Sequence, residues 1–238
     1  MIISFTPSIE EILQFHIQKY FKDIKFSENW TRYKSVNVSL IHPFEYFYAK
    51  LNGIESVQEE LAKGKKLFPS VTIISDSENA AYSEIVNESV CTLDKYFIED
   101  LKNDLALPVD ERMFQVAESD LQTLESLDNV NFVRSDVNCR THIIIEIWAD
   151  NLILKNRLYD LIDLFLKANG RFDLGRNAGL EIMDGTVKGQ KGSLYNFDFG
   201  KTLYGATIGF DVIFQKVQFT SDIQISNGVE IDAVFRRD

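Results

Sequence analysis

The segment that decides the fold runs from Thr141 to Gly170 and reads THIIIEIWADNLILKNRLYDLIDLFLKANG. Ile143, Ile145 and Ile147 would project to one side of an extended chain, because successive side chains of a strand alternate between faces. After Asp150, a residue suited to the N-cap, apolar residues recur at spacings of three and four. The segment therefore predicts a buried strand followed by an amphipathic helix that ends near Gly170.

The helix expected after that strand has two distinct sides. Apolar residues at helical spacing form one stripe, and the charged residues between them are expected in solvent, where charges normally lie. The expected buried stripe is Leu154, Leu158, Leu161, Ile162, Phe165 and Leu166, and the expected solvated side is Lys155, Arg157, Asp160 and Asp163.

A second stretch, Leu194 to Gln218, reads LYNFDFGKTLYGATIGFDVIFQKVQ and predicts a long strand that pairs beside the first. Ile208 and Phe210 share one strand face, whereas Gly209 and Asp211 share the other. One apolar face and one mostly polar face are typical of an antiparallel sheet. The predicted fold class is α+β, a mostly antiparallel sheet with helices packed on it. The residues expected to be buried together between sheet and helix are Ile145, Trp148, Leu158, Leu161, Ile162 and Phe210.

The rest of the chain predicts further elements of one domain, residues 1–238. Residues 8–11 read as a capping box ahead of a helix of about four turns. Residues 35–41 and 69–74 read as strands. An acidic, helix-prone stretch at 76–140 is interpreted as a helical insertion or elaboration on this domain.

Composition limits the classes of function. The chain has 25 basic and 36 acidic residues, a formal net charge of -11, so strong binding to nucleic acid phosphates is not expected. No apolar run approaches the ~20 residues needed to span a bilayer. The opening residues lack the pattern of a signal peptide, and the two cysteines form no CxxC pair, so a reduced, cytoplasmic history is expected.

A search for catalytic, cofactor and metal motifs predicts none. The glycine-rich stretch 184–193 fails the phosphate-loop pattern, because Lys191 is followed by Gly192. The three histidines lie far apart in the sequence, without metal-ligand spacing. Cys139 lies close to Arg140 and His142, but neighbours on a strand alternate sides and no third group orients them. We therefore expect a protein that is not an enzyme.

The same glycine-rich stretch is instead a candidate partner interface. Glycine permits unusual backbone conformations, so a mobile or hairpin-like loop is expected there, followed by aromatic residues that could anchor a partner. A plain solvent-exposed hairpin remains the alternative. The candidate interface residues are Gly185, Lys188, Gly189, Lys191, Gly192, Tyr195, Phe197 and Phe199.

Several segments together resemble a known family. The run VNVSLIHPFEYFYAKLN at 36–52, followed by KLFPSVTII at 66–74, is similar to the opening sheet of tail terminator proteins of contractile-tailed, T4-like bacteriophages. The segment 143–166 resembles the next strand and long helix of that family, and 204–217 resembles its late strand. The resemblance rests on the order of elements and leaves 76–140 unmatched.

The resemblance implies a structural virion protein. It implies a subunit that assembles as a homohexameric ring at the head-proximal end of the tail, ends polymerisation of tube and sheath, and joins the tail to a neck or head-completion protein. Expected partners are further copies, tail tube and sheath proteins, the neck protein, and genome DNA that passes through without tight binding. The expected location is the virion, after assembly in the host cytoplasm.

Two alternatives to this function stay open. A different neck, adaptor or baseplate protein would place the chain elsewhere in the same particle. A cellular α+β enzyme would require a pocket with convergent polar groups.

Overall fold

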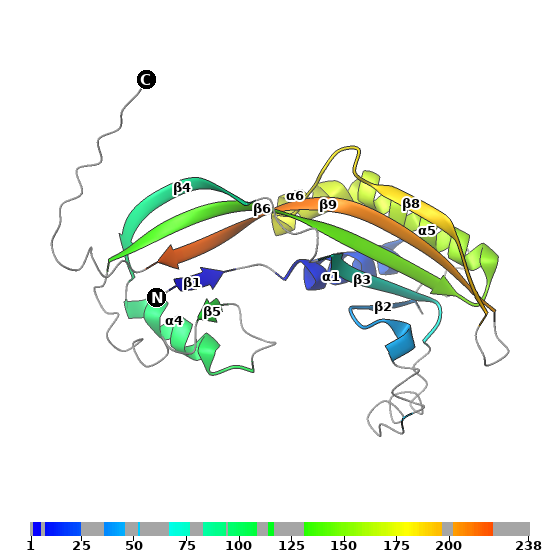
Figure 1. Ribbon diagram of the computed structural model, residues 1–238, viewed down its shortest axis with the longest axis horizontal. Coiled ribbons are helices and arrows are strands. Elements are labelled where there is room, and N and C mark those ends of the chain that lie inside the picture. Colours follow the sequence, from blue (N-terminus) through cyan, green and yellow to red (C-terminus); the bar gives the residue numbers. More distant parts are fainter. Residues whose placement is uncertain are drawn as a thin grey trace. The chain divides into compact units, whose positions relative to one another are not determined.

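The structure, a computed structural model, has an α+β fold with a mostly antiparallel, mixed sheet (Figure 1). It describes residues 2–5, 8–24, 36–45, 52, 67–76, 83–93, 95–108, 114–116, 131–196 and 202–220. The strand order is β2-β3-β6-β9-β1-β5, with β4 paired to β6 and both β7 and β8 paired to β9. The fold class predicted from the sequence is therefore confirmed.

The described residues form two compact units. Unit 1 takes the described residues of 1–7, 83–139 and 215–238, and unit 2 takes those of 8–82 and 140–214. The strands β6 (Asn131–Ala149) and β9 (Thr202–Thr220) contribute residues to both. The sequence predicted a single domain with an insertion at 76–140, whereas the residues of that stretch group with both ends of the chain.

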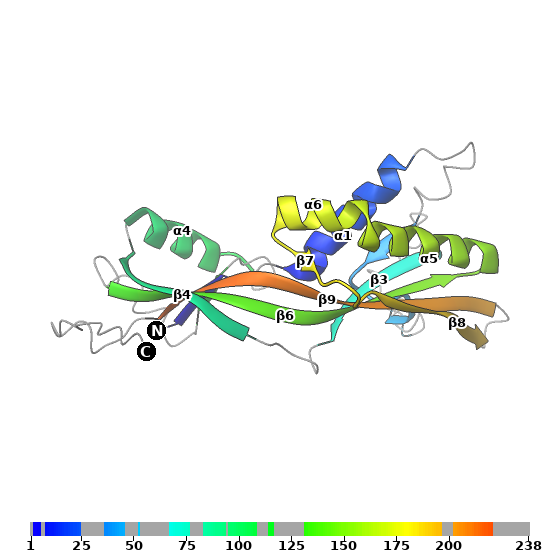
Figure 2. The same ribbon diagram turned by 90° about the horizontal axis from the view of Figure 1, so that it is seen from above.

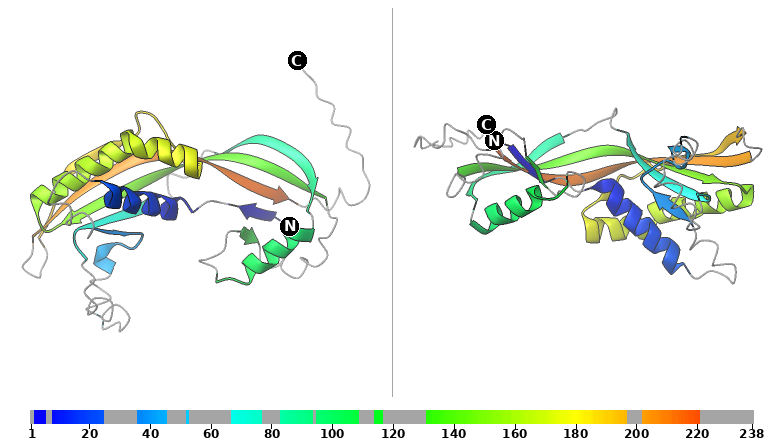
Figure 3. Two further views of the ribbon diagram at one scale, coloured as in Figure 1. Left: turned by 180° about the vertical axis from the view of Figure 1, so that it is seen from behind. Right: turned by 90° about the horizontal axis from the view of Figure 1, so that it is seen from below.

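Unit 2 is a sheet with helices on one side. Figures 2 and 3 show the helices 9–23, 152–167 and 169–178 on the same side of the strands of this unit. β2 pairs with β3 in parallel, and β3 pairs with β6 antiparallel. The elements are α1 (Ile9–Asp23), β2 (Asn37–Ser39), β3 (Ser70–Asp76), β6 from 140 onward, α5 (Leu152–Lys167), α6 (Asn169–Ala178), β7 (Glu181–Ile182), β8 (Lys188–Asn196) and β9 up to 214.

The alternation predicted for β6 builds the core of unit 2. Ile143, Ile145 and Ile147 are fully buried, and β3 places Val71 opposite Ile147 and Ile73 opposite Ile145. Branched aliphatic side chains fit such a pleated surface well. Four of the six residues expected between sheet and helix are buried there, namely Ile145, Leu158, Ile162 and Phe210. Trp148 is buried on the opposite face, because it shares a face of β6 with Glu146, to which its Nε1 donates. Leu161 is only half-buried, so the assignments of Trp148 and Leu161 were wrong.

The start of α5 differs from the prediction by one residue. Asn151, not Asp150, is the N-cap, and its side-chain oxygen accepts hydrogen bonds from the N–H groups of Ile153 at 2.8 Å and Leu154 at 3.1 Å. The amide side chain satisfies two donors that the first turn leaves without partners. The capping box expected at Ser8 is absent, because its side chain makes no capping hydrogen bond.

The end of α5 also differs from the prediction. α5 ends at Lys167, and a second helix, α6, follows and ends at Gly179, whose φ of 65° is left-handed. Gly170 lies inside α6, where a Cβ atom would come within 2.3 Å of the Phe165 ring. This glycine permits close packing of two helices and is not a helix stop. The prediction that Gly170 ends the helix is therefore wrong.

Unit 1 is a smaller sheet with one helix. Its core consists of Ile3, Leu93, Ile98, Leu101 and Phe132. Buried Asp104 is satisfied, because its carboxylate accepts a hydrogen bond from Phe114 N at 2.9 Å. The elements are β1 (Ile2–Phe5), β4 (Ser83–Thr92), α4 (Lys95–Leu105), β5 (Phe114–Val116), β6 up to 139 and β9 from 215.

The prediction of helical structure across 76–140 is therefore wrong for most of the described residues. Only α4 is helical there, and β4, β5 and the first half of β6 are strands. The physical reason is visible in β4, where every side chain from 85 to 90 is exposed. A stretch of strand that buries neither face carries no alternation of apolar and polar residues, so residues 85–90 give no period-two signal.

The packing of α5 on the sheet predicts a difference between two leucines of the same helix. Leu158 is fully buried and Leu164 is 52% exposed. Leu158→Ala should lower the free energy of unfolding by about 2–5 kcal/mol, because it removes buried methyl groups and leaves a cavity. Leu164→Ala should change it by less than about 0.5 kcal/mol. Urea denaturation measures both, and equal effects would contradict the packing.

Candidate functional site: a groove beside the strand β8

The glycine-rich stretch predicted as a loop is mostly a strand. β8 begins at Lys188 and pairs antiparallel with β9, with Lys188 opposite Gly209 and Leu194 opposite Tyr204. Among the strands that the structure describes, β9 is the only partner of β8. The prediction of a mobile loop over 184–193 is therefore wrong from residue 188 onward, and β8 presents an open edge.

Only the residues just before β8 form a turn. Gly185 has a φ of 73°, which residues with side chains rarely adopt. The Thr186 hydroxyl donates to Met183 O at 2.8 Å and accepts from Asp211 N at 3.1 Å. These bonds fasten the turn to β9, so the hairpin-like part of the prediction holds for this short piece.

Gly189 is required by a contact with α5. A Cβ atom at this position would lie 2.0 Å from the hydroxyl oxygen of Tyr159. Since Gly189 lies opposite Ile208, both face the side of the sheet that α5 covers. The glycine that suggested flexibility in the sequence therefore brings β8 and α5 close together.

A buried lysine also fastens β8 to α5. Lys155, expected in solvent, is only 2% exposed, and its ammonium donates a hydrogen bond to the carbonyl of Lys191. That carbonyl lies where the register of β8 shifts, between Gln190 and Ser193. The expectation was wrong because the carbonyl of a neighbouring strand supplies the partner that a buried charge needs. Burial lowers the pKa of Lys155, and the nearby positive charge of Lys191 lowers it further.

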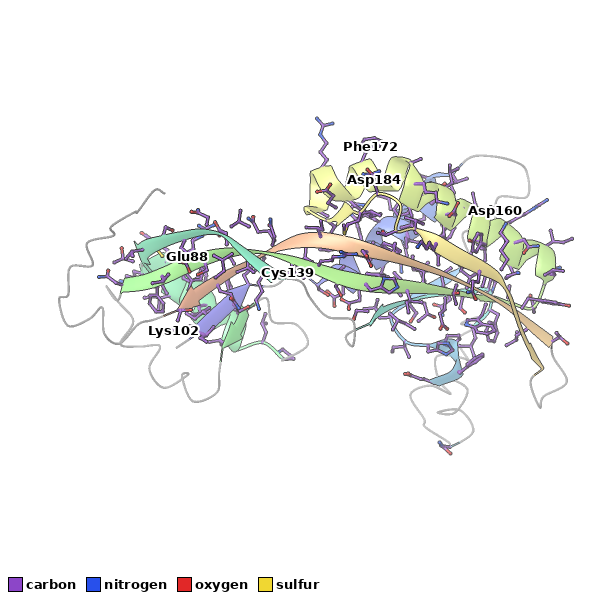
Figure 4. All side chains as sticks on the ribbon, turned by 45° about the horizontal axis from the view of Figure 1, so that its top comes forward. Glu88, Lys102, Cys139, Asp160, Phe172 and Asp184 are labelled. Atoms are coloured by element: carbon purple, nitrogen blue, oxygen red, sulfur yellow. The ribbon has the colours of Figure 1, made fainter. Side chains whose placement is uncertain are left out.

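Lys191 forms a second contact between the two elements, in which a side chain of β8 reaches residues of α5. Its ammonium lies 4.7 Å from the centre of the Tyr159 ring and donates to the carboxylate of Asp160, which Figure 4 labels on α5. The hydrogen bond to Asp160 raises the pKa of Lys191. Lys191 is therefore engaged with its own chain.

A groove of about 770 Å³ lies beside β8 on the face of unit 2 opposite its helices. We call this the polar face of unit 2, and define it by His142 and Glu146 of β6 and Asp211 of β9. Strands β6, β8 and β9 and the turn before β8 all contribute to the groove. Its lining is Arg140, His142, Ile144, Glu146, Gly185, Thr186, Lys188, Gly189, Gln190, Thr207, Gly209 and Asp211.

Asp211 is the centre of one ionic cluster in the groove. Its carboxylate accepts a hydrogen bond from His142 Nδ1 at 2.6 Å and another from the guanidinium of Arg140. The imidazole lies over Gly209, where a Cβ atom would come within 2.9 Å of its Nε2. Burial raises the pKa of Asp211, but the bonds from His142 and Arg140 outweigh burial, and the net pKa is lowered.

Glu146 is the centre of a second cluster. Its carboxylate lies 2.8 Å from His42 Nε2 and accepts from Trp148 Nε1 at 3.1 Å. Phe44 N donates to His42 Nδ1 at 3.2 Å, so Nε2 carries the proton that Glu146 accepts. The Phe44 and Trp148 rings pack with centroids 5.2 Å apart. Both carboxylates of the groove are therefore bound by donors from the same chain.

The interface residues predicted from the sequence fall partly on this groove. Gly185, Lys188 and Gly189 line it, and Lys191 and Gly192 follow on the exposed part of β8. Lys191 is turned toward α5 and not into the groove, so only the first three of these residues belong to one site.

The structure does not test the anchoring role expected of the three aromatic residues. Tyr195 belongs to β8, and Phe197 and Phe199 lie outside the described residues. Their role as anchors stays a prediction.

The sequence reasoning missed the β6 and β9 residues of the groove. Arg140, His142 and Glu146 share one face of β6, and Gly209 and Asp211 share one face of β9. The two-residue period could have placed each group on one face. Nothing in the sequence set the pairing register that joins the two groups.

The candidate nucleophile Cys139 and its sequence neighbour His142 do not come together in the structure. Cys139 is buried, which raises the pKa of its thiol, and it lies an odd number of positions from His142, on the other side of the strand. Within the described ranges, no three His, Cys, Asp or Glu side chains gather as a metal site. Asp163 bonds to Lys167 at 2.7 Å, and Asp160 bonds to Lys191, so these helix carboxylates are also engaged.

No protein-family model matches this chain, and no curated protein matches it at a significant level. None of the helices in the described part of the chain is long and apolar enough to cross a membrane.

The contact between β8 and α5 predicts different effects of two glycine substitutions. Gly189→Ala should lower the free energy of unfolding by about 1–3 kcal/mol, because its methyl group would collide with Tyr159. Gly192→Ala is the control, since a Cβ there meets nothing within 4 Å. In a Tyr159→Leu background, Gly189→Ala should lose most of its effect. Chemical denaturation of the four variants tests this, and equal effects at both glycines would contradict it.

The Asp211 cluster predicts acid sensitivity. Because its pKa is lowered by folding, Asp211 stabilises the fold above its unfolded value of about 3.9 and loses this contribution as pH falls through the folded value. Asp211→Asn should therefore flatten the decline of unfolding free energy between about pH 5 and pH 2. Urea titrations at a series of pH values measure the slope. Identical slopes for wild type and variant would refute the prediction.

Proposed function

We propose that this chain is a structural subunit of a contractile bacteriophage tail, a tail terminator that forms a hexameric ring at the head-proximal end. The observation that carries the proposal is the sheet of unit 2. The segments that resemble this family supply β2, β3, β6 and β9, which are consecutive neighbours in the strand order. The long helix of the resemblance is α5, which packs on the same unit.

The groove supports a role in assembly more than a role in chemistry. Asp211 and Glu146 already accept hydrogen bonds from Arg140, His142, His42 and Trp148. Carboxylates held in this way are poor general bases, because their lone pairs are engaged, and the hydrogen bonds to Asp211 also lower its pKa. A polar groove beside an open strand edge suits contact with another polypeptide.

The acidic charge fits a ring through which DNA passes. With 36 acidic and 25 basic residues, the chain has too few clustered cations for strong phosphate binding. In this proposal the ring ends tube and sheath polymerisation, joins the tail to the neck, and lets the genome pass without holding it.

The test is removal of the gene from the genome that encodes this chain, followed by electron microscopy of the particles. Tails of irregular length and heads without tails are expected, and supply of the wild-type chain in trans should restore normal particles. A reconstruction of normal particles should show a sixfold ring of this chain at the head-proximal tail end. The purified chain should be wholly or partly monomeric, because negative subunits resist association without a template.

Two results would overturn the proposal. Normal tail length and normal joining without the gene would exclude a terminator. A ring located at the baseplate or elsewhere in the neck would assign the chain to another structural role.

A further inference from the structure

Among the described strands that pair with one neighbour only, β4 and β8 are the longest, and they carry opposite charge. In unit 1, β4 pairs with β6 alone, and in unit 2, β8 pairs with β9 alone. An open edge presents backbone N–H and C=O groups that can pair with another chain. Glu88 on β4 and Lys188 on β8 are both exposed.

The carboxylate of Glu88 is available on the face of unit 1 away from α4. Cys91 and its cross-strand partner Phe132 pack into the core that α4 completes. Glu88 lies three residues from Cys91, so it projects from the opposite face. There it accepts one hydrogen bond, from the Ser135 hydroxyl at 3.2 Å. It makes no ion pair with a described residue.

Lys188 is the corresponding cation on unit 2. It lies opposite Gly209 and projects with it from the polar face, away from α5. Lys191, the other lysine of β8, is bound to Asp160, whereas Lys188 forms no ion pair with any residue that the structure describes. Lys188 is therefore the lysine of β8 whose charge is not paired with a described residue.

We propose that β4 of one copy pairs with β8 of the next copy, with Glu88 beside Lys188. This inference rests on the proposed ring and names the contact that would build it. Pairing β4 with β4 would bring two Glu88 residues together, and pairing β8 with β8 would bring two Lys188 residues together. Like charges on neighbouring strands destabilise a sheet and opposite charges stabilise it.

The charges therefore favour head-to-tail association over a twofold dimer. A contact between two different surfaces leaves one open edge at each end of the assembly, and such contacts generate rings when the rotation closes. If the faces of the two sheets that lack helices are aligned, Glu88 and Lys188 project to the same side. The stretch Asn87–Thr92 of β4, which pairs regularly with β6, supplies the continuous edge for the contact.

The test is a charge exchange in the full chain. Glu88→Lys alone and Lys188→Glu alone should each weaken self-association about tenfold, because each places like charges at the contact. The double variant should restore it. An equimolar mixture of the two single variants should restore it as well, because each then meets an opposite charge on its neighbour. Sedimentation velocity at concentrations up to ~0.5 mM measures association, since weak contacts require high concentration.

Matched controls lie on α4 of unit 1, where Glu99 and Lys102 are exposed. Glu99→Lys and Lys102→Glu change the net charge by the same amounts as the two test variants. Neither control should weaken association tenfold, and their mixture should show no rescue. If the control variants weakened self-association equally and their mixture restored it equally, the effect would depend on net charge alone. That result would overturn the edge contact.

A second measurement uses the wild-type chain. A mixture of unlabelled and ¹⁵N-labelled protein is treated with a carbodiimide, which joins an amine to a carboxylate in direct contact. Mass spectrometry should find a mixed-isotope link between the peptide with Glu88 and the peptide with Lys188. Wild-type protein that shows neither association nor this link would overturn the proposal.

These outcomes are separable from those of the proposed function. A tail ring built through other strands would overturn the edge contact and leave the terminator role standing. Absence of the chain from the tail would overturn the terminator role, whereas the charge exchange would still decide the edge contact in solution.

Discussion

The two-residue period of β6 is the constraint on which unit 2 depends. Side chains one position apart must point to opposite faces. Ile143, Ile145 and Ile147 therefore enter the core under the helices, and His142 and Glu146 must enter the polar face between them. A shift of one residue would bury the ionic clusters and expose the isoleucines. Stability and the candidate site are thus fixed by the same strand register.

The glycines near β8 show how one residue type serves different physical ends. Gly185 adopts a left-handed backbone in a turn, Gly189 admits the Tyr159 side chain, and Gly209 makes room for the His142 ring. Only the first of these is a matter of backbone freedom. The other two concern the distance between packed elements, which places α5 on one side of the sheet and the Asp211 cluster on the other.

The elements that could be predicted from the sequence are those in which burial imposes a regular spacing of apolar residues. Elements with one apolar face, such as α5 and the second half of β6, could be predicted because burial imposes a period. β4 could not, since its exposed side chains from 85 to 90 follow no period. β8 was misread because the glycine that permits contact with Tyr159 looks the same in a sequence as a glycine in a loop. The groove depended on pairing between distant segments, which no local pattern records.

Lys155 has a consequence for the edge that β8 presents. Its ammonium, buried to 2% exposure, has the Lys191 carbonyl as its acceptor. A slip of β8 by one position along β9 would withdraw this carbonyl and leave the buried ammonium without its acceptor, which is unfavourable. The need of Lys155 for this acceptor therefore favours one register of β8 on β9. Lys155 therefore sets the position of Lys188 along β9, although Lys155 itself is buried and need not contact a neighbouring molecule.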